Sequence, residues 1–268
     1  MKPLSKMPEN RVKAIALEGR LRNCKNVVTL GVRANFADYS PQEAELIRNA
    51  DKIYYPSTFY ADLFDAMGKA TFPSYHTYKC VQDKIKQSAL FELLEISHPK
   101  TRVFYGKRQK SLIRQHFDFP FIAKVARGSA LGRGVYLIRN EKELSNYFEL
   151  TRPAYIQQYL PIDRDIRVVV IGNRIVHAYW RIAPLNEYRS NVAVGGTIQL
   201  DGVPEEACNL ALRVARACRW DDVGIDICEH NGRFYVLEAN MKYGREGFRK
   251  AGLDYDRLME SMIENEEI

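Results

Sequence analysis

The spacing of hydrophobic and polar residues changes repeatedly along the chain between the period of a strand and that of a helix. Short apolar runs indicate buried strands, and apolar positions three or four residues apart indicate helices with one buried face. One helical pattern covers residues 81–94 and ends before His98-Pro99. Further helices are expected at 41–50, with Ser40 as N-cap, and at 59–67, 110–116, 141–150, 204–219 and about 254–264. Strands are expected at 27–32, 52–56, 102–105, 121–126, 135–138, 154–160, 166–171, 174–182, 223–229 and 233–240.

The alternation of these elements predicts a mixed fold of the α/β and α+β classes, without internal repeats. We divide the chain into four segments. A basic N-terminal segment covers residues 1–25, and a short N-terminal α/β domain covers residues 26–80. Two further α+β units are expected, a central one at residues 81–152 and a C-terminal one at residues 153–268.

Composition excludes a disordered or collagen-like chain, because 46% of the 268 residues are hydrophobic and 27% are charged. The net charge of +7 first suggests an anionic partner. Residues 1–35 hold eight basic and two acidic side chains, which leaves 32 basic and 31 acidic side chains in the other 233 residues. The excess is therefore local, and no nucleic-acid partner is expected.

No run approaches the roughly 20 apolar residues of a membrane helix, and the N-terminus lacks the apolar stretch of a secretory signal. Five cysteines are scattered without a CxxC motif, which favours reduced thiols. These patterns favour a cytoplasmic protein without a membrane partner. The cysteines and His177 are interpreted as packing residues.

A candidate metal site lies in the last predicted hairpin, where Asp226, Glu238 and Asn240 offer the oxygen donors that Mg²⁺ prefers. Whether they share a face depends on the turn. A two-residue turn, Asn231-Gly232, would place Asp226 and Glu238 on opposite faces. A three-residue turn that begins at His230 would place them on one face.

The three-residue turn is preferred, because it also gathers apolar residues on the other face of the hairpin. In that register Asp226 lies opposite Val236. The residues expected to face the core are Ile225, Ile227, Tyr235 and Leu237. A single carboxylate in a strand is most often a surface charge. The prediction of a metal site therefore depends on Asp226, Glu238 and Asn240 all lying on one face.

A second candidate site surrounds Lys124, which lies in the apolar run FIAKVA just before a loop that contains Gly128, Gly132 and Gly134. Glycines let a backbone approach an anion closely, and a buried ammonium needs a counter-ion. The spacing matches neither a P-loop nor a Rossmann fingerprint. The loop is thus either a plain turn or part of a phosphate site.

Arg181, Arg189 and Asn191 are concentrated in the segment RIAPLNEYRSNVAVGG, beside paired glycines. Arginines in loops are usually solvated. Their place between two candidate phosphate-site elements favours contacts to an oxyanion instead.

Taken in order, several motifs resemble the ATP-grasp superfamily, and specifically the RimK-type ligases that attach glutamate to a carboxylate. They are Asp83-Lys84, AKVARGSALGRGV, QQYL, RDIRVVVIGNRIVHAYWR, RSNVAVGG, and VGIDI followed by LEAN. The resemblance covers about residues 50–262. It implies an ATP-grasp fold in which two α+β subdomains clamp the nucleotide behind the short N-terminal domain.

The resemblance also implies roles for individual residues. The nucleotide contacts it implies are Lys84, Lys124, the lid loop with Gly128, Ser129, Gly132 and Gly134, the linker Gln158, Tyr159 and Leu160, the ribose-region contact Asp165, and Arg189, Ser190 and Asn191. Asp226, Glu238 and Asn240 match the magnesium ligands. Two Mg²⁺ ions are expected, with Mn²⁺ as an alternative. Arg181 and Arg189 are expected to stabilise the transferring phosphoryl group.

The implied reaction joins a carboxylate to an amine, such as glutamate, through an acylphosphate made from ATP. A protein carboxylate is one candidate acceptor, and a homo-oligomer stays open. Two alternatives remain: a kinase-like ATP-grasp enzyme that stops after phosphorylation, and a nucleotide-binding protein without turnover. A nucleic-acid-binding module, suggested only by net charge, is a third.

The sequence departs from the family pattern in three places. Gln158 stands where the family commonly has Glu. Asn240 is followed by Met241-Lys242-Tyr243-Gly244 instead of a small residue and Ser-Pro-Gly. Lys242 and Tyr243 are therefore expected near the acceptor, where they would mark a different substrate. The first 25 residues match no known motif.

Overall fold

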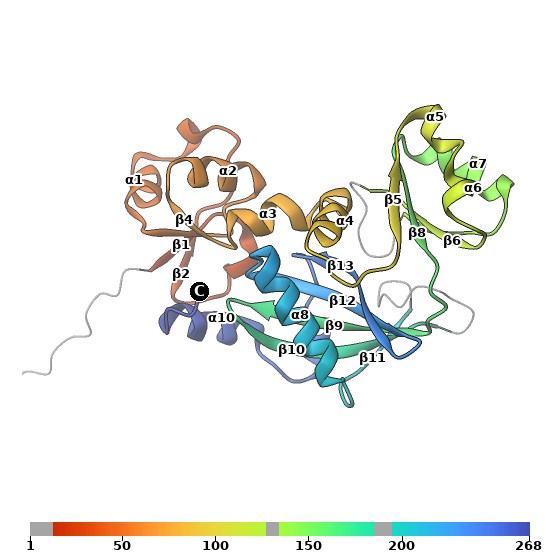
Figure 1. Cartoon of the computed structure of the whole chain (residues 1–268). Coiled ribbons are helices and arrows are strands. Elements are labelled where there is room, and N and C mark those ends of the chain that lie inside the picture. The colour runs from red at the N-terminus through yellow and green to blue at the C-terminus, as the bar shows by residue number, and fades with distance from the viewer. Residues whose placement is uncertain (1–12, 127–133, 185–194) are drawn as a thin grey trace, which may run out of the picture. The chain divides into compact units, whose positions relative to one another are not determined.

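The computed structural model describes residues 13–126, 134–184 and 195–268, and its contacts group the chain into two compact units (Figure 1). The first unit consists of Met1–Phe72 with Tyr255–Ile268, and the second of Pro73–Asp254. The expected mixed architecture is confirmed, because a parallel sheet lies in the first unit and two antiparallel sheets lie in the second. The four-segment division stays a prediction.

Four short parallel strands form the sheet of the first unit, in the order β2-β1-β3-β4. They are β1 (Ala14–Ala16), β2 (Val27–Thr29), β3 (Lys52–Tyr54) and β4 (Ala70–Phe72). The unit also contains the 3-10 helices η1 (Gly19–Leu21) and η2 (Phe36–Asp38), and the helices α1 (Pro41–Asn49) and α2 (Thr58–Ala66). β1 and β4 were missed from the sequence, and β2 and β3 are shorter than the strands predicted at 27–32 and 52–56.

Helix α1 begins as expected at Ser40, whose hydroxyl accepts a hydrogen bond from the Glu43 amide at 3.2 Å. The Glu43 carboxylate in turn accepts one from the Ser40 amide at 2.8 Å, which completes a capping box. The apolar side of the helix joins a core around Ile15, Ile53 and Phe64.

Helix α10 (Tyr255–Glu264) returns the end of the chain to the first unit. The Tyr255 hydroxyl accepts a hydrogen bond from Arg20 Nε at 2.9 Å and lies 3.4 Å from the Tyr55 hydroxyl. The Tyr54 hydroxyl donates to the carbonyl oxygen of Ile268 at 2.9 Å. No pattern in the sequence indicated that this helix belongs with the N-terminal strands.

The second unit opens with two helices, α3 (Tyr75–Val81) and α4 (Lys84–Leu93), where the sequence predicted one helix over residues 81–94. The break has a local cause. The Asp83 carboxylate accepts hydrogen bonds from the amides of Ile85 at 3.0 Å and Lys86 at 3.3 Å, which starts a new helix at Lys84.

An antiparallel sheet follows in the order β5-β8-β6-β7. Its strands are β5 (Thr101–Phe104), β6 (Phe121–Lys124), β7 (Val135–Ile138) and β8 (Ala154–Gln158). Helices α5 (Gly106–Lys110), α6 (Ile113–His116) and α7 (Glu141–Leu150) accompany it. Ile113 on α6 and Tyr147 on α7 share a buried cluster with Phe104, Phe121 and Ile156 of the strands.

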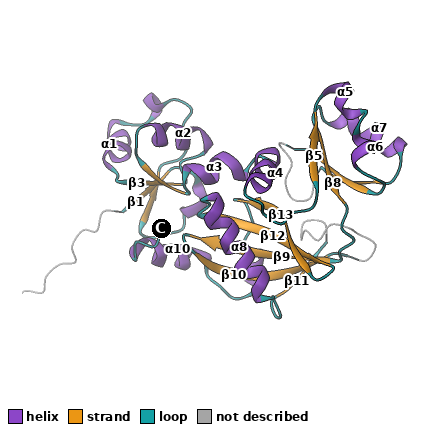
Figure 2. Ribbon diagram, viewed as in Figure 1, coloured by secondary structure: helices purple, strands orange, loops and turns teal. Residues whose placement is uncertain are grey.

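The other sheet of this unit is antiparallel, with five strands in the order β11-β10-β9-β12-β13 (Figure 2). Its strands are β9 (Arg164–Ile171), β10 (Arg174–Ile182), β11 (Thr197–Gln199), β12 (Asp222–His230) and β13 (Arg233–Asn240). Helix α8 (Glu205–Cys218) packs on this sheet, and the short helix α9 (Glu246–Lys250) contacts β10. Buried residues such as Val168, Ile225 and Ile227 make one face apolar.

The turn of the β12–β13 hairpin differs from the preferred prediction. His230 pairs with Arg233, so the turn has two residues, and Asn231 and Gly232 have positive φ of 51° and 72°. Ile227, rather than Asp226, pairs with Val236. The predicted turn and the predicted partner of Asp226 were therefore wrong.

A β-bulge in β13 nevertheless places Asp226 and Glu238 on one face of the sheet, as predicted. Ile227 pairs with Val236 but Asp226 pairs with Glu238, so β13 contains one extra residue, Leu237. Asp226 and Glu238 consequently share a face, as expected, although for a different reason. The core-facing residues of β13 are the buried Val236 and Ala239, not Tyr235 and Leu237.

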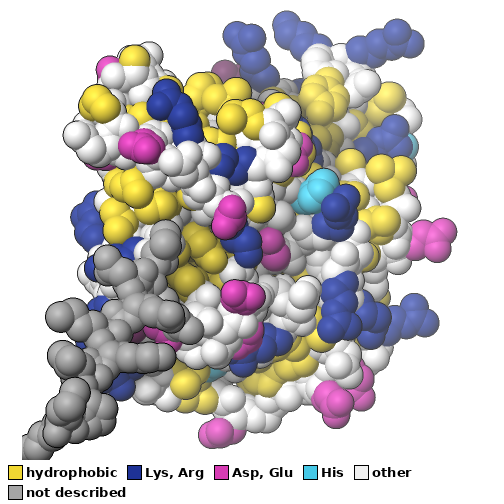
Figure 3. Space-filling view, turned by 90° about the vertical axis from the view of Figure 1, so that its left-hand side faces the viewer, with side chains coloured by type: hydrophobic (Ala, Val, Ile, Leu, Met, Phe, Trp, Pro, Cys, Tyr) yellow, Lys and Arg dark blue, Asp and Glu magenta, His cyan; other side chains and the backbone are white. Residues whose placement is uncertain are grey.

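In the view of Figure 3, positive and negative side chains are interspersed across the visible face, with hydrophobic side chains between them. None of the helices within residues 13–126, 134–184 and 195–268 has the length and apolar character needed to cross a membrane.

Candidate functional site

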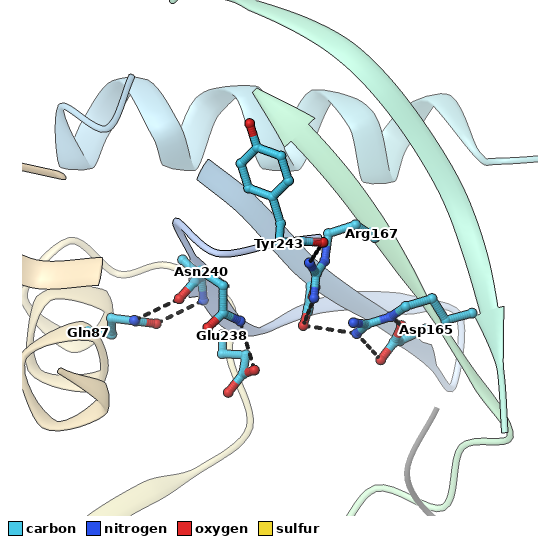
Figure 4. Close-up of polar contacts among 9 residues, drawn as sticks. Gln87, Asp165, Arg167, Glu238, Asn240 and Tyr243 are labelled. Atoms are coloured by element: carbon cyan, nitrogen blue, oxygen red, sulfur yellow. Dashed lines mark hydrogen bonds and ion pairs between the residues drawn. The ribbon is translucent and has the colours of Figure 1, made fainter. Parts of the chain in front are cut away.

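The polar face of the five-stranded sheet gathers charged side chains from β9, β10, β12 and β13, several of which are drawn in Figure 4. Arg181 on β10 pairs with Asp165 on β9, and Arg167 on β9 pairs with Asp226 on β12. Asp226 pairs in turn with Glu238 on β13. Directly paired residues project from the same face of a sheet, so the register alone brings these five side chains together.

Two arginines and two aspartates form a buried ion-pair network at the centre of this face. Arg181 donates from Nε to Asp165 Oδ1 at 2.6 Å and from Nη2 to Asp165 Oδ2 at 2.7 Å. Its Nη2 also lies 2.9 Å from Asp226 Oδ2. Arg167 donates to the same carboxylate, from Nη2 to Oδ2 at 2.9 Å and from Nε to Oδ1. The fork geometry fixes both guanidinium planes.

The network keeps Arg181 charged although this side chain and its partners are buried. Burial opposes the charged form of Arg181, but the carboxylates of Asp165 and Asp226 outweigh burial and raise the pKa of Arg181 above its ordinary value. Asp165 was expected near the ribose of the nucleotide. In the structure its carboxylate is held by Arg181, and the ribose contact stays a prediction.

Arg167 is a site residue that the sequence analysis missed. Besides Asp226, its Nη1 donates to the Tyr243 carbonyl oxygen at 3.1 Å. Gly224 makes room for this contact, because a Cβ there would lie 2.9 Å from Arg167 Cδ and 2.5 Å from Tyr243 Cβ. A signal was present in the sequence: Arg167 interrupts an apolar strand just as Lys124 does, and a buried cation needs a partner.

Tyr243 is held against the sheet at its other end as well, since its hydroxyl donates to Asp222 Oδ1 at 2.7 Å. Tyr243 is buried and Lys242 is exposed. The segment that departs from the family pattern therefore lies against the charged face through the Tyr243 backbone. The expected place of Lys242 near an acceptor stays a prediction.

Glu238 connects this face with two lysines from other elements. Its Oε1 accepts a hydrogen bond from Asn240 Nδ2 at 2.8 Å, and its Oε2 lies 3.6 Å from Lys84 Nζ at the start of α4. Burial acts to raise the pKa of Glu238, but Lys84, Lys124 and the Asn240 amide outweigh it and lower that pKa to about 2. Glu238 is thus ionised at neutral pH.

Lys124 ends strand β6 with only 6% of its surface exposed, and its Nζ lies 5.9 Å from the centre of the Tyr155 ring. Burial lowers the pKa of this ammonium, and Glu238 acts in the opposite direction. The Tyr147 hydroxyl donates to the Lys124 carbonyl oxygen at 2.7 Å, which holds the end of the strand. The sequence prediction of a buried lysine is confirmed.

The described residues of the site leave a positive charge to be balanced. Counted by formal charge, the cluster holds three carboxylates, Asp165, Asp226 and Glu238, and four cations, Arg167, Arg181, Lys84 and Lys124. An anion is therefore the natural ligand, and a bare cation is disfavoured next to the two lysines. This balance fits a polyphosphate.

The donor chemistry also fits Mg²⁺ when it arrives with phosphate. Among the described residues, no group of three or more His, Cys, Asp or Glu side chains could hold a metal ion by itself. Mg²⁺ needs fewer protein ligands, because it is usually bound through one or two carboxylates plus substrate phosphates. Glu238 and Asn240 offer such oxygens on one face, while both oxygens of Asp226 already accept bonds from arginine.

The other predicted nucleotide contacts are only partly described. Strand β8 ends at Gln158, whose side chain is exposed. The backbone N–H of Gln158 donates to the Lys100 carbonyl oxygen at 2.8 Å. Of the two residues that follow, Tyr159 is half-buried and Leu160 is buried. Gly134 has a positive φ of 74° directly before β7. Gly128, Ser129, Gly132, Arg189, Ser190 and Asn191 lie outside the described residues.

The cysteines and His177 have the packing roles expected of them. None of the five cysteines forms a disulfide bond, and burial raises the pKa of Cys218 and of Cys228 to about 12. The His177 ring lies 5.0 Å from Tyr179 and 5.1 Å from Phe248, and burial lowers its pKa.

Comparison with known proteins gives concordant results. A family model described as a RimK-like ATP-grasp domain matches residues 81–263. The chain is 31% identical over 209 residues to a probable alpha-L-glutamate ligase of Parasynechococcus marenigrum (strain WH8102), an alignment that covers 75% of this chain and 45% of that protein. It is 29% identical over 191 residues to coenzyme gamma-F420-2:alpha-L-glutamate ligase of Methanococcus maripaludis, covering 68% of this chain and 66% of that one.

Among solved structures, a RimK domain ATP-grasp protein from Sphaerobacter thermophilus has a TM-score of 0.70 and 16% identity, and the match covers 93% of this chain and 98% of that one. This similarity shows the ATP-grasp fold. The chain spans less than two thirds of the length of the two curated relatives named above.

Proposed function

The chain belongs to the RimK-like ATP-grasp family, and on that premise we propose that it is an ATP-dependent ligase that joins a carboxylate to an amine. The observation that carries the proposal is the charged cluster that this sheet face forms with Lys84 of α4 and Lys124 of β6, in which four cations lie among three carboxylates. Phosphoryl transfer needs positioning and charge neutralisation more than covalent help from the protein. This cluster supplies both.

The proposed reaction has two steps. An oxygen of the substrate carboxylate attacks the γ-phosphorus of ATP, which gives an acylphosphate and ADP. The amine nitrogen then attacks the acyl carbon, inorganic phosphate leaves, and the nitrogen loses a proton. Lys84 and Lys124 bind phosphate oxygens. Arg181, oriented by Asp165 and Asp226, and Arg189 stabilise the charge that develops on the transferring group.

We further propose that Glu238 and Asn240, with Asp226 behind them, hold Mg²⁺ together with the nucleotide, as two ions, and that Mn²⁺ can replace it. The metal would neutralise charge on the phosphates. The oxygen donors on one face and the ionised state of Glu238 support this assignment. The five cysteines form no disulfide bond, which supports a cytoplasmic location.

For the amine substrate we propose glutamate, because the two curated relatives named above carry the name glutamate ligase. The acceptor would be a small-molecule or protein carboxylate. A screen of amino acids against candidate carboxylates, with ADP release as readout, tests both assignments. Phosphate release that requires both substrates supports a ligase. A stable phosphorylated product formed without the amine would contradict it and indicate a kinase-like enzyme.

The metal assignment has its own test. Glu238→Gln is expected to abolish metal-dependent ADP release while the far-UV circular dichroism spectrum stays unchanged. Glu229→Gln is the matched control, because Glu229 is an exposed glutamate of the same hairpin. Normal turnover in Glu238→Gln would refute the assignment of Glu238.

A further inference from the structure

Strand β13 is the edge of its sheet, so alternate backbone groups along it point away from β12 and need partners elsewhere. Ala239 lies at such a position, between the two proposed metal ligands Glu238 and Asn240. Its side chain is buried, with 1% of its surface exposed, so its outward N–H and C=O groups are shielded from water as well. Unpaired buried backbone groups are costly.

Gln87 on α4 satisfies both groups of Ala239 (Figure 4). Its Oε1 accepts a hydrogen bond from the Ala239 amide at 2.8 Å, and its Nε2 donates to the Ala239 carbonyl oxygen at 2.9 Å. The same Nε2 donates to the Val81 carbonyl oxygen at 2.6 Å, at the end of α3. The side-chain amide thus pairs with the edge strand as a neighbouring strand would, and Gln87 is only 3% exposed.

One helical turn of α4 therefore contacts two consecutive residues of β13. Lys84, three residues before Gln87, lies 3.6 Å from Glu238, and Gln87 binds Ala239 next to it. Residues three apart lie on the same side of a helix. The relative position of Lys84 and Glu238 depends on how α4 is held against the strand, and the paired amide bonds of Gln87 set it.

We infer that Gln87 is a positioning residue for the nucleotide and metal site: it fixes the strand segment Glu238–Asn240 relative to Lys84. The inference rests on the proposed function. No contact of Gln87 with nucleotide or metal is required. Residues that orient metal ligands from behind typically change metal affinity by about 10- to 100-fold when they are replaced.

The test compares ADP binding by calorimetry with and without MgCl₂, which requires no turnover. The readout is the factor by which Mg²⁺ increases the affinity for ADP. Gln87→Met keeps the length of the side chain but leaves both Ala239 groups unpaired. We expect that factor to fall by about tenfold or more in this variant. If Gln87→Met does not fold, the same measurement is made on Gln87→Glu, which keeps only the acceptor for the Ala239 amide.

Phe91→Leu is the matched control. Phe91 lies on the same helix one turn further on, is 3% exposed and packs against Trp220, so its truncation loosens α4 without touching β13 hydrogen bonds. A positioning role predicts that Phe91→Leu lowers the melting temperature but keeps the magnesium effect. An equal loss in both variants would show a purely structural role and overturn the inference, as would a Gln87→Met variant with the full magnesium effect.

The wild-type protein separates this inference from the proposed function. If Mg²⁺ does not increase ADP affinity in the wild type, the proposed metal site is wrong and the inference falls with it. If wild type shows the effect and Gln87→Met retains it, only the inference about Gln87 is overturned.

Discussion

Neutralising Glu238 should remove a pH-dependent contribution to stability, which Glu238→Gln measures directly. The pKa of this carboxyl is lowered from 4.5 to about 2, chiefly because Lys84 and Lys124 outweigh the effect of burial. One pKa unit corresponds to about 1.4 kcal/mol, so the shift amounts to about 3 kcal/mol at most. The Glu238 side chain is only 21% exposed, so solvent screens its interaction with the two lysines only weakly.

The lowered pKa of Glu238 determines whether stability rises or falls with pH. Between pH 4.5 and about 2 the unfolded chain binds a proton at this residue and the folded protein does not, so the unfolding free energy falls as the pH is lowered. The contribution is complete above the unfolded pKa. Wild type should therefore be about 1–3 kcal/mol more stable than Glu238→Gln at pH 7, and the difference should shrink by up to about 1.4 kcal/mol for each pH unit below 4.5.

Urea unfolding followed by circular dichroism between pH 7 and the lowest pH at which the protein stays folded gives the difference. The exposed Glu229 on β12 again supplies the control, and Glu229→Gln should change stability by no more than about 0.5 kcal/mol. Parallel pH curves for wild type and Glu238→Gln would refute the assignment of a strongly lowered pKa to Glu238, and with it the electrostatic account of the site.

Three further substitutions test the ion pairs and the packing around the site, and the cap of helix α1. Asp226→Asn leaves two buried guanidinium groups with one carboxylate fewer, and urea unfolding should show a loss of about 3–5 kcal/mol; a loss below 1 kcal/mol would mean that the network relaxes freely. Gly224→Ala places a Cβ 2.5 Å from Tyr243 Cβ, so a lower melting temperature and about 1–3 kcal/mol of destabilisation are expected, and an unchanged melting temperature would contradict this close packing. Ser40→Ala removes the hydroxyl that caps α1 at the Glu43 amide and should destabilise the protein by about 1 kcal/mol in the same urea assay, whereas a neutral effect would show that the cap is dispensable.

Elements with strong local signals were predicted well from sequence. Helix α7 occupies residues 141–150 as expected, because an amphipathic pattern follows an Asn140 N-cap. Helix α1 begins at the predicted Ser40. The central strand β1 has only three residues and depends on pairing with β2 and β3, which no local pattern reveals.

Which side chains meet was decided by pairing between distant strands. The sequence analysis identified Lys124 and Glu238, but it missed Arg167, whose partners Asp226 and Tyr243 lie 59 and 76 residues further along the chain. Such contacts become visible only when β9 and β12 pair, since local periodicity carries no information about register.

The sequence by itself determined the inventory of the site: oxygen donors on the last hairpin, a lysine in an apolar strand and a motif order typical of the RimK-like ATP-grasp family. The tertiary structure decided their arrangement. A bulge at Leu237, not the length of the turn, turned Glu238 toward Asp226. Side chains alternate between faces along a strand, so one extra residue reverses the face of every residue beyond it, and only the paired strands show where that residue lies.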